Sequence, residues 1–403
     1  MQEYFFFPSW PLPLGNLFWL GTLLLLAGVT GEAVERWLKQ PALLGWVIVG
    51  LVLGPHVTGA ITESDLLTMN GLVQFAAGII LFELGQRVDF SWLKRNPKLV
   101  GTSLLESGLA FAVIFFIIEG SGGPLVFAAV VAAIGAATSP AVVLTVIRDL
   151  RAQGQVTERL LLLTALNSTY SFITVNMLLA PLATEYKGDW VSVVVHPAYL
   201  VLGSLAFAAT FAAATNTLLR ALGRREEVQF VCIVALLVVA VWATMALQLS
   251  TPLALLGYGT MLRTFDTERH FVSLNFGKLG RLAIILLFST TAAFIDPGVI
   301  PAGIGLGIAV IVGRFVGKTL GVFAYAKPSG LTYRKAWYLS LGLTPKSGLA
   351  IILVNQTILL YPAFAPELIG VIMSVVLLLE LAGPSLLQMA IKRSGEAAEK
   401  GSA

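Results

Sequence analysis

Charged residues are scarce in this chain of 403 residues, of which 12% are Asp, Glu, Lys or Arg while 57% are hydrophobic. Soluble globular proteins carry about 25% charged residues. The composition therefore excludes a water-soluble globular fold, and it predicts that residues 1–403 form a single membrane domain with short loops. The mean hydropathy of +0.86 agrees with this prediction.

Cysteine and histidine are also nearly absent. Cys232 is the single cysteine, so no disulfide can form within the chain. The three histidines, His56, His196 and His270, do not have the spacing of a metal-ligand motif. We therefore expect no cofactor, no tightly bound metal and no enzymatic activity.

Apolar segments of about 20 residues are abundant, and each is long enough to cross a membrane as a helix. We predict an all-α integral membrane protein with thirteen transmembrane helices. These cover residues 15–33, 42–61, 66–85, 98–118, 125–147, 159–183, 190–222, 228–247, 250–262, 279–295, 302–326, 336–360 and 366–391.

Basic residues are distributed unevenly between the two sets of loops that these helices create. All but four of the 26 lysines and arginines fall in one set of alternate loops or in the C-terminal tail. Lys187 is alone in the other set, and Arg314, Lys318 and Lys346 lie within predicted helices. Because basic loops stay in the cytoplasm, we expect a multi-pass protein of the inner (plasma) membrane with its N-terminus outside and its C-terminus inside. The basic loops then reflect topology, and no nucleic acid partner is expected.

An odd number of helices allows two groups of six around a middle one. We predict repeat one at 15–183, a linker helix at 190–222 and repeat two at 228–391. Corresponding helices of the repeats would run in opposite directions, which is the inverted architecture of many secondary transporters. A short cytoplasmic tail, 392–403, follows, and its polar end from Ser394 is expected to be disordered.

Two predicted helices contain a proline and hydroxyl side chains near the middle. The motifs are Thr138-Ser139-Pro140 in the fifth helix and Thr344-Pro345-Lys346 in the twelfth. Proline interrupts a helix, and irregular backbone at membrane depth is tolerated only where it is buried in protein or lines a cavity. The matched positions predict a substrate site at two unwound helices, and the alternative is a pair of kinks without function.

Short motifs with a fixed order along the chain carry a family resemblance. They read GWVIVG at 45–50 with LGP at 53–55, LFELG at 81–85, TSPAVVL at 138–144, GRFVGK at 313–318 and ELAGP at 380–384. In order and placement they resemble the cation/proton antiporter superfamily, the sodium/proton exchanger family. They are most similar to its second branch, which includes bacterial sodium/proton antiporters and potassium-efflux systems.

This resemblance implies a six-helix core in which the fifth and twelfth helices cross at their unwound centres. The core would pack on a separate scaffold that usually forms a homodimer, and its displacement would give alternating access. Members of the two main branches carry Asp-Asp or Asn-Asp midway along the sixth helix, where the aspartate exchanges the cation for protons. The matching positions here are Asn167 and Ser168, so that carboxylate is absent.

Proton coupling without this aspartate must use another titratable group, because amide and hydroxyl side chains offer neutral oxygens but do not titrate. The candidates for proton coupling or charge compensation are Glu83, Glu106, Arg314, Lys318 and Lys346, and Glu380 is a further acid within a predicted helix. The candidates for binding the substrate or ion are Thr138, Ser139, Asn167, Ser168 and Thr344.

Arg314 and Lys318 are four residues apart and therefore share a helical face. Two uncompensated cations at membrane depth are costly, so we predict that a carboxylate of Glu106 or Glu83 lies within reach of one of them. Lys318 has the alternative of extending its ammonium group to the membrane surface. Glu106 and Asn167 each lie eight residues into their helices, which predicts that they share one level.

Two transport functions remain open. The first is antiport of a monovalent cation (Na+ or K+) against protons, with the titrating group moved to a glutamate or a lysine. The second is transport of a small anion or a neutral solute, favoured by Arg314, Lys318, Lys346 and two positive half-helix N-termini. A channel-like or regulatory member of the same fold is a further alternative. For Lys346 we favour neutralisation of carbonyl groups at a half-helix C-terminus over substrate contact.

Overall fold

The computed structural model of this chain describes residues 15–88, 90–187, 195–222, 225–266, 276–346, 350, 353–354, 357 and 365–398. Every regular element within them is helical, and nine helical stretches among them are long and apolar enough to cross a membrane. The all-helical class is therefore confirmed. The long stretches contain α1 (Asn16–Ala33), α3 (Glu63–Gly85), α5 (Pro97–Gly120), α6 (Leu125–Ala136) with α7 (Pro140–Asp149), α8 (Gln155–Lys187), α10 (Ser204–Leu222), α11 (Glu226–Ala246), α14 (Ile300–Ala324) and α17 (Ala365–Ser394).

Four of the predicted membrane helices correspond to shorter helices. They are α2 (Leu43–Leu53), α12 (Thr251–Phe265), α13 (Gly277–Ala293) and α15 (Tyr333–Gly342). A short helix, α4 (Phe90–Arg95), joins α3 to α5. The start of the predicted linker helix, at 190, and most of the second half of the predicted twelfth helix lie outside the described residues. The number of crossings stays a prediction.

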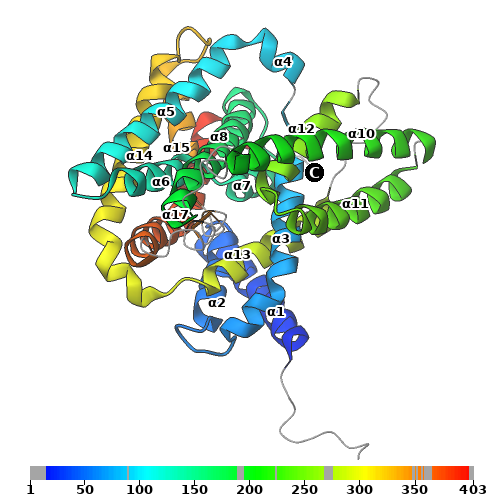
Figure 1. Cartoon of the computed structure of the whole chain (residues 1–403), viewed down its shortest axis with the longest axis horizontal. Helices are drawn as coiled ribbons and strands as arrows, with labels where there is room; N and C mark the ends of the chain where they lie inside the picture. The colour runs from blue at the N-terminus through cyan, green and yellow to red at the C-terminus, as the bar shows by residue number, and fades with distance from the viewer. Residues whose placement is uncertain are drawn as a thin grey trace, which may run out of the picture.

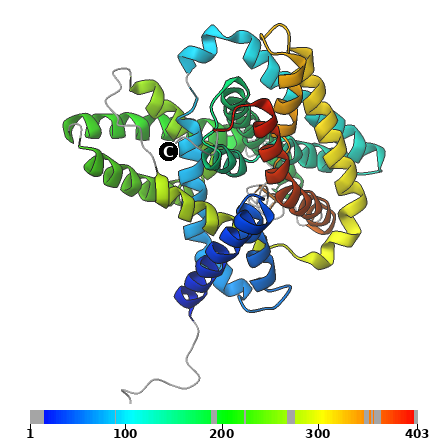
Figure 2. The same cartoon turned by 180° about the vertical axis from the view of Figure 1, so that it is seen from behind.

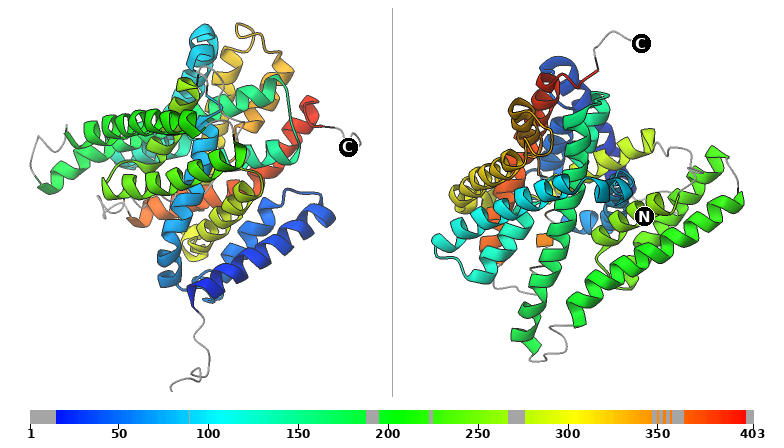
Figure 3. Two further views of the ribbon diagram at one scale, coloured as in Figure 1. Left: turned by 90° about the vertical axis from the view of Figure 1, so that its right-hand side faces the viewer. Right: turned by 90° about the horizontal axis from the view of Figure 1, so that it is seen from above.

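The helices pack as two bundles, which lie side by side in Figure 1. The interrupted bundle consists of α5, α6, α7, α8, α14, α15 and α17, and the α3 bundle consists of α1, α2, α3, α10, α11, α12 and α13. Figure 2 shows this grouping from behind, and Figure 3 shows α10 and α11 projecting away from the interrupted bundle. Contacts of α7 with α3, of α8 with α12 and of α17 with α2 join the two bundles.

The outer faces of both bundles are apolar. Phe116 on α5, Val312 and Leu320 on α14, and Val231 and Trp242 on α11 are all exposed. Soluble monomers rarely expose continuous apolar surface of this kind. These faces need hydrocarbon around them, which agrees with the membrane assignment.

Helices α6 and α7 are the two halves of one interrupted helix, as the proline motif predicts. α6 ends at Ala136, and Pro140 is the first residue of α7, a position where the missing N–H costs no helical hydrogen bond. The Ser139 hydroxyl caps α7 by accepting from the Val142 N–H at 3.2 Å. The break leaves the last carbonyls of α6 without helical partners.

A second interruption follows α15, whose last residue is Gly342, and residues 343–346 are not helical. Two hydrogen bonds join it to the first interruption. The Thr138 hydroxyl donates to the Leu343 carbonyl at 3.0 Å, and the Ser139 N–H donates to the Pro345 carbonyl at 3.0 Å. Two segments that are far apart in the chain thus meet at the centre of the interrupted bundle.

Glycines on α14 allow it to approach α5 backbone to backbone. A methyl group added at Gly317 would lie 2.6 Å from the Ala110 Cα, and one added at Gly321 would lie 2.4 Å from the Glu106 Cα. Such close packing is predicted by the repeated small residues of this helix, which are Gly303, Gly305, Gly307, Gly313, Gly317 and Gly321. Gly305 belongs to this glycine series, but no atom lies within 4 Å of a methyl group added there. It therefore takes no part in the contact between α14 and α5.

The start of the C-terminal tail is ordered, which corrects the expectation of disorder from Ser394 onward. Glu396 is buried, and its carboxylate accepts from the N–H groups of Val156 at 2.9 Å and Thr157 at 2.8 Å, in the first turn of α8. Lys335, at the start of α15, lies 3.5 Å from the same carboxylate. Glu396 therefore caps α8 and ties it to α17, although it lies 240 residues from Val156 in the chain. The local sequence around either residue does not predict this contact.

Replacing Gly321 with alanine should destabilise the protein. The new methyl group would force α14 away from α5, at a cost of about 1–3 kcal/mol, which exceeds the roughly 1 kcal/mol that alanine adds to helix propensity. Thermal unfolding of the purified protein measures the difference. Gly305→Ala on the same helix is the matched control and should be neutral or stabilising. Equal melting temperatures for the two variants would contradict the close approach.

Replacing Glu396 with glutamine should loosen the tail, because a neutral amide is a poorer acceptor for two N–H groups at a helix N-terminus. The expected loss is about 1–2 kcal/mol of stability, together with faster hydrogen exchange at the Val156 and Thr157 amides. Glu158→Gln removes the same charge from an exposed position in the first turn of α8 and should leave both amides protected. Unchanged exchange in Glu396→Gln would contradict the cap.

Candidate functional site

Arg314, on α14, lies where the two interruptions meet. Its Nε donates to the Gly135 carbonyl at 2.8 Å, and its Nη1 donates to the Thr344 carbonyl at 2.8 Å. Its Nη2 donates to the carbonyls of Ala137 at 3.0 Å and Leu343 at 2.9 Å. The guanidinium group thus satisfies carbonyls at the C-terminal ends of both half-helices, where the helix dipole is negative. Glu106, one of the two acids predicted to pair with Arg314 or Lys318, pairs with Lys318 instead.

Lys346 has a similar environment. Its ammonium group is buried and donates to the Ile134 carbonyl and, at 3.3 Å, to the Ala137 carbonyl. Both carbonyls belong to the C-terminal end of α6. This is the carbonyl-neutralising position that the sequence favours for Lys346.

Glu106 and Lys318 form a fully buried ion pair between α5 and α14. Their side chains are 0% and 1% exposed, and the Lys318 Nζ lies 2.6 Å from the Glu106 Oε2. The structure therefore supplies the acidic partner predicted for this face of α14, and Lys318 does not extend to the membrane surface. Gly317 and Gly321 flank Lys318 and let its helix approach Glu106.

Asn167 links this ion pair to the interrupted helix. Its Oδ1 accepts from the Thr138 N–H at 3.1 Å, which fixes the orientation of the amide because a backbone N–H can only donate. The Nδ2 then donates to the Glu106 Oε1 at 3.0 Å and to the Thr138 hydroxyl at 3.1 Å. The Ser107 hydroxyl donates to the same carboxylate oxygen at 3.1 Å. Glu106 and Asn167 thus share one level, as their positions predict.

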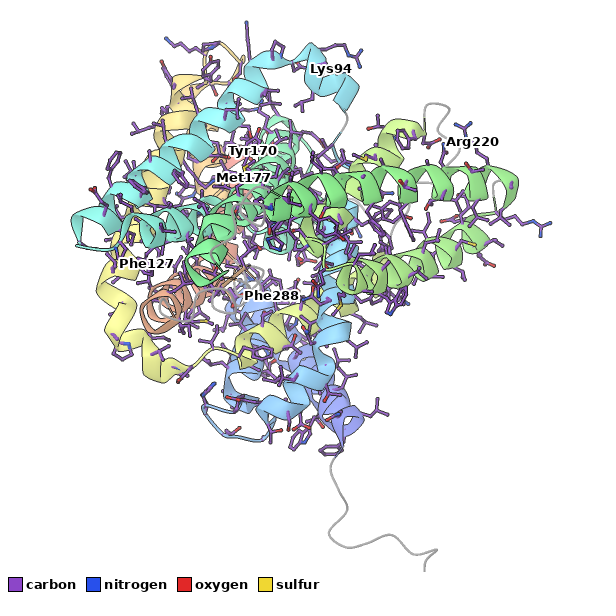
Figure 4. The ribbon with its side chains drawn as sticks, in the orientation of Figure 1. Lys94, Phe127, Tyr170, Met177, Arg220 and Phe288 are labelled. Atoms are coloured by element: carbon purple, nitrogen blue, oxygen red, sulfur yellow. The ribbon has the colours of Figure 1, made fainter. Side chains whose placement is uncertain are left out.

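The remaining predicted site residues lie around the interruption. The Ser168 hydroxyl donates to the Thr138 carbonyl at 3.3 Å, and the Ser139 hydroxyl caps α7. The Thr344 hydroxyl is buried and has no hydrogen-bond partner within the described part of the chain. Figure 4 labels Tyr170, which lies three residues beyond Asn167 on α8.

A small cavity opens at the interruption. Its volume of about 20 Å³ is enough for about one water-sized guest. In this conformation an organic solute does not fit. None of the described residues that line the cavity is acidic. They are Ala137, Thr138, Ser139, Pro140, Ser168, Phe172, Lys346, Ala350 and Leu353.

Glu83 is separate from this centre. Its carboxylate receives the Arg148 guanidinium at 2.6 and 2.7 Å, so α3 of one bundle is paired with α7 of the other. Sequence reasoning assigned Arg148 only to a cytoplasmic loop. The available signal was depth, because Glu83 and Arg148 each lie near the same predicted end of their helices. Ser107 was missed as well, although it is adjacent to Glu106.

Comparison with known proteins agrees with this fold. The profile of the family described as "Sodium/hydrogen exchanger, transmembrane" matches residues 21–392. Two structures of the sodium proton antiporter MjNhaP1 from Methanocaldococcus jannaschii share the fold at 18% sequence identity. One, determined at pH 8, has a TM-score of 0.71 and covers 93% of this chain and 98% of that one. The other, from electron microscopy, has a TM-score of 0.70 and covers 95% and 99%.

Two relatives match over shorter stretches. The iron transporter MagA of Paramagnetospirillum magneticum is 29% identical over 125 residues, which are 31% of this chain and 28% of that protein. The probable Na(+)/H(+) antiporter GerT of Bacillus cereus is 36% identical over 81 residues, which are 20% and 21%. The chain matches less than a third of the length of either relative. The family profile, by contrast, spans nearly the whole chain, and this chain belongs to the sodium/hydrogen exchanger family of membrane transporters.

Proposed function

We propose that this protein is a secondary active transporter that exchanges a monovalent cation, Na+ or K+, for protons by alternating access. In this proposal the Glu106–Lys318 pair takes over the role of the absent aspartate. The observation that carries it is the position of the pair, which is fully buried and hydrogen-bonded through Asn167 to the interrupted helix. Family membership supports the transport class.

The exchange follows from charge conservation in a dry site. A lone buried carboxylate or ammonium group is very costly, whereas the pair is neutral. A cation that reaches Glu106 replaces the ammonium group of Lys318 as its partner, so Lys318 must lose its proton to keep the pair's charge constant. Glu106 supplies the negative charge, and the oxygens of Thr138 and Ser168 offer neutral coordination nearby. The Asn167 oxygen joins them once its amide, whose nitrogen faces Glu106 in this conformation, has turned. One proton leaves for each cation that arrives.

Access to the pair requires movement, because its side chains are shielded from solvent. We infer that the interrupted bundle moves relative to the α3 bundle, and that the Glu83–Arg148 contact between them changes as it does so. We further propose a single transport domain with thirteen spans, inverted repeats at 15–183 and 228–391 around a linker helix, an outside N-terminus and an inside C-terminus. A homodimer in the inner membrane completes this arrangement.

A small anion is the second candidate substrate, and one observation favours it. The cavity at the interruption is lined by Lys346 and by Ser139 and Pro140 at the N-terminus of α7, and its lining within the described ranges contains no acidic residue. Helix N-termini and ammonium groups attract negative charge. The two substrates make opposite predictions in one assay.

Proteoliposomes with an imposed pH gradient provide that assay. Addition of Na+, K+ or Li+ should dissipate the gradient in the wild type, and Glu106→Gln should reduce the response to that of empty liposomes because the amide cannot hold the charge. Glu119→Gln, an exposed position on the same helix, is the matched control and should retain transport. A cation response that persists in Glu106→Gln would place proton coupling elsewhere. A response to small anions alone would establish the second candidate.

The ion pair also predicts non-additive stability. Glu106→Gln or Lys318→Met alone leaves a buried charge without its partner and should cost about 3–5 kcal/mol. The double variant removes both charges and should recover most of that loss. Melting temperatures of the purified wild type, both single variants and the double variant measure the coupling. A double variant that loses the sum of the two single effects would contradict the pair.

A further inference from the structure

We propose that a pocket at the end of α17 binds the phosphate headgroup of an anionic phospholipid. This basic pocket has a volume of about 570 Å³ and lies between the α1–α2 connection and α17. Its polar and basic lining includes Lys39, Gln40, Ser385, Gln388, Lys392 and Arg393. The pocket lies outside the site of the proposed exchange.

The charge of the basic pocket fits a phosphate group. Lys39, Lys392 and Arg393 are all exposed, and none of the described residues that line the pocket is acidic. Within the described part of the chain, no carboxylate lies within 4 Å of these three cations. Three cations that line one pocket together with amide and hydroxyl side chains are groups that bind phosphate, and basic pockets between membrane helices bind anionic headgroups.

The backbone that presents Lys39 is unusual. Its φ of 54° places it in the left-handed region, which non-glycine residues rarely adopt. A π-helical turn, Val34–Leu38, precedes it, and such turns are rare and frequently found at functional sites. The Ser385 hydroxyl donates to the Gln40 Oε1 at 2.6 Å and holds this connection against α17. The backbone of Lys39 is therefore held beside the pocket through its neighbour Gln40.

The surroundings of the basic pocket indicate a lipid as the source of the phosphate. Trp37 and Leu38, immediately before Lys39, are 77% and 65% exposed, and Leu381 at the other edge is also exposed. Tryptophan beside lysine is typical of the membrane–water interface, where rings and ammonium groups lie at headgroup level. Ala382, Leu386 and Met389 add apolar lining. An anionic phospholipid can contact both the basic and the apolar residues of this surface, whereas a free phosphate can contact only the basic ones.

A lipid in this pocket would contact both bundles. Lys39 and Gln40 precede α2 of the α3 bundle, and Lys392 and Arg393 end α17 of the interrupted bundle. Because a ligand stabilises the conformation that it binds, the lipid should stabilise this arrangement of the two bundles against heat.

The test is titration of the purified full-length protein in detergent with cardiolipin, phosphatidylcholine or inorganic phosphate, followed by native mass spectrometry and thermal unfolding. Cardiolipin should bind and raise the melting temperature, and phosphatidylcholine should not. The variant Lys39→Gln/Lys392→Gln/Arg393→Gln should bind cardiolipin about a hundredfold more weakly, from roughly 1 kcal/mol per basic residue.

The matched control is Lys94→Gln/Arg220→Gln/Lys278→Gln, which removes three exposed cations outside the pocket. Figure 4 shows Lys94 and Arg220 at the periphery of the molecule. The control should bind cardiolipin as the wild type does. Equal binding by the two triple variants would overturn the proposal. A full thermal shift with inorganic phosphate alone would overturn the assignment to a lipid.

Discussion

The unpaired carbonyl groups of two interrupted helices are the constraint on which the site depends. Carbonyls buried at membrane depth need donors, because water is not there to satisfy them. Arg314 donates to Gly135 and Ala137 at the end of α6 and to Leu343 and Thr344 after α15, and Lys346 donates to the end of α6. Among the described residues three cations are buried, and the backbone carbonyls take two of them, Arg314 and Lys346. The third, Lys318, pairs with the carboxylate of Glu106.

The carboxylate at the level of Asn167 comes from the neighbouring helix α5. Asn167, on α8, donates to Glu106 at 3.0 Å, at the position where the resemblance to the exchanger family implies an aspartate. Close packing makes this possible, because Gly317 and Gly321 let α14 approach the Glu106 backbone. The negative charge that a cation/proton exchange needs is thus present, with a lysine already bound to it.

Sequence predicted the parts of this site that follow from helical periodicity and depth. The Thr138-Ser139-Pro140 break follows from the proline, and the shared level of Glu106 and Asn167 follows from their spacing along their helices. An acid beside Arg314 or Lys318 follows from the cost of unpaired cations at membrane depth. The choice between Arg314 and Lys318 could not be predicted, since the directions of carbonyls in an unwound segment are not encoded by periodicity. The Glu396 cap on α8 joins segments distant in the chain, and no local pattern predicts it. The Glu83–Arg148 pair also joins distant segments, and for it the sequence offered only the similar depth of the two residues. The family motifs indicated the fold because they are spread over its whole length.

The central claim is that a cation displaces Lys318 from Glu106 and that the displaced lysine releases its proton. The most direct measurement is the proton released when Na+ or K+ is added to the purified protein in weakly buffered detergent solution. The account predicts release of about one proton per chain, saturating with the cation concentration, and none in the Glu106→Gln variant. Cation binding without proton release, or equal release from Glu106→Gln, would contradict it.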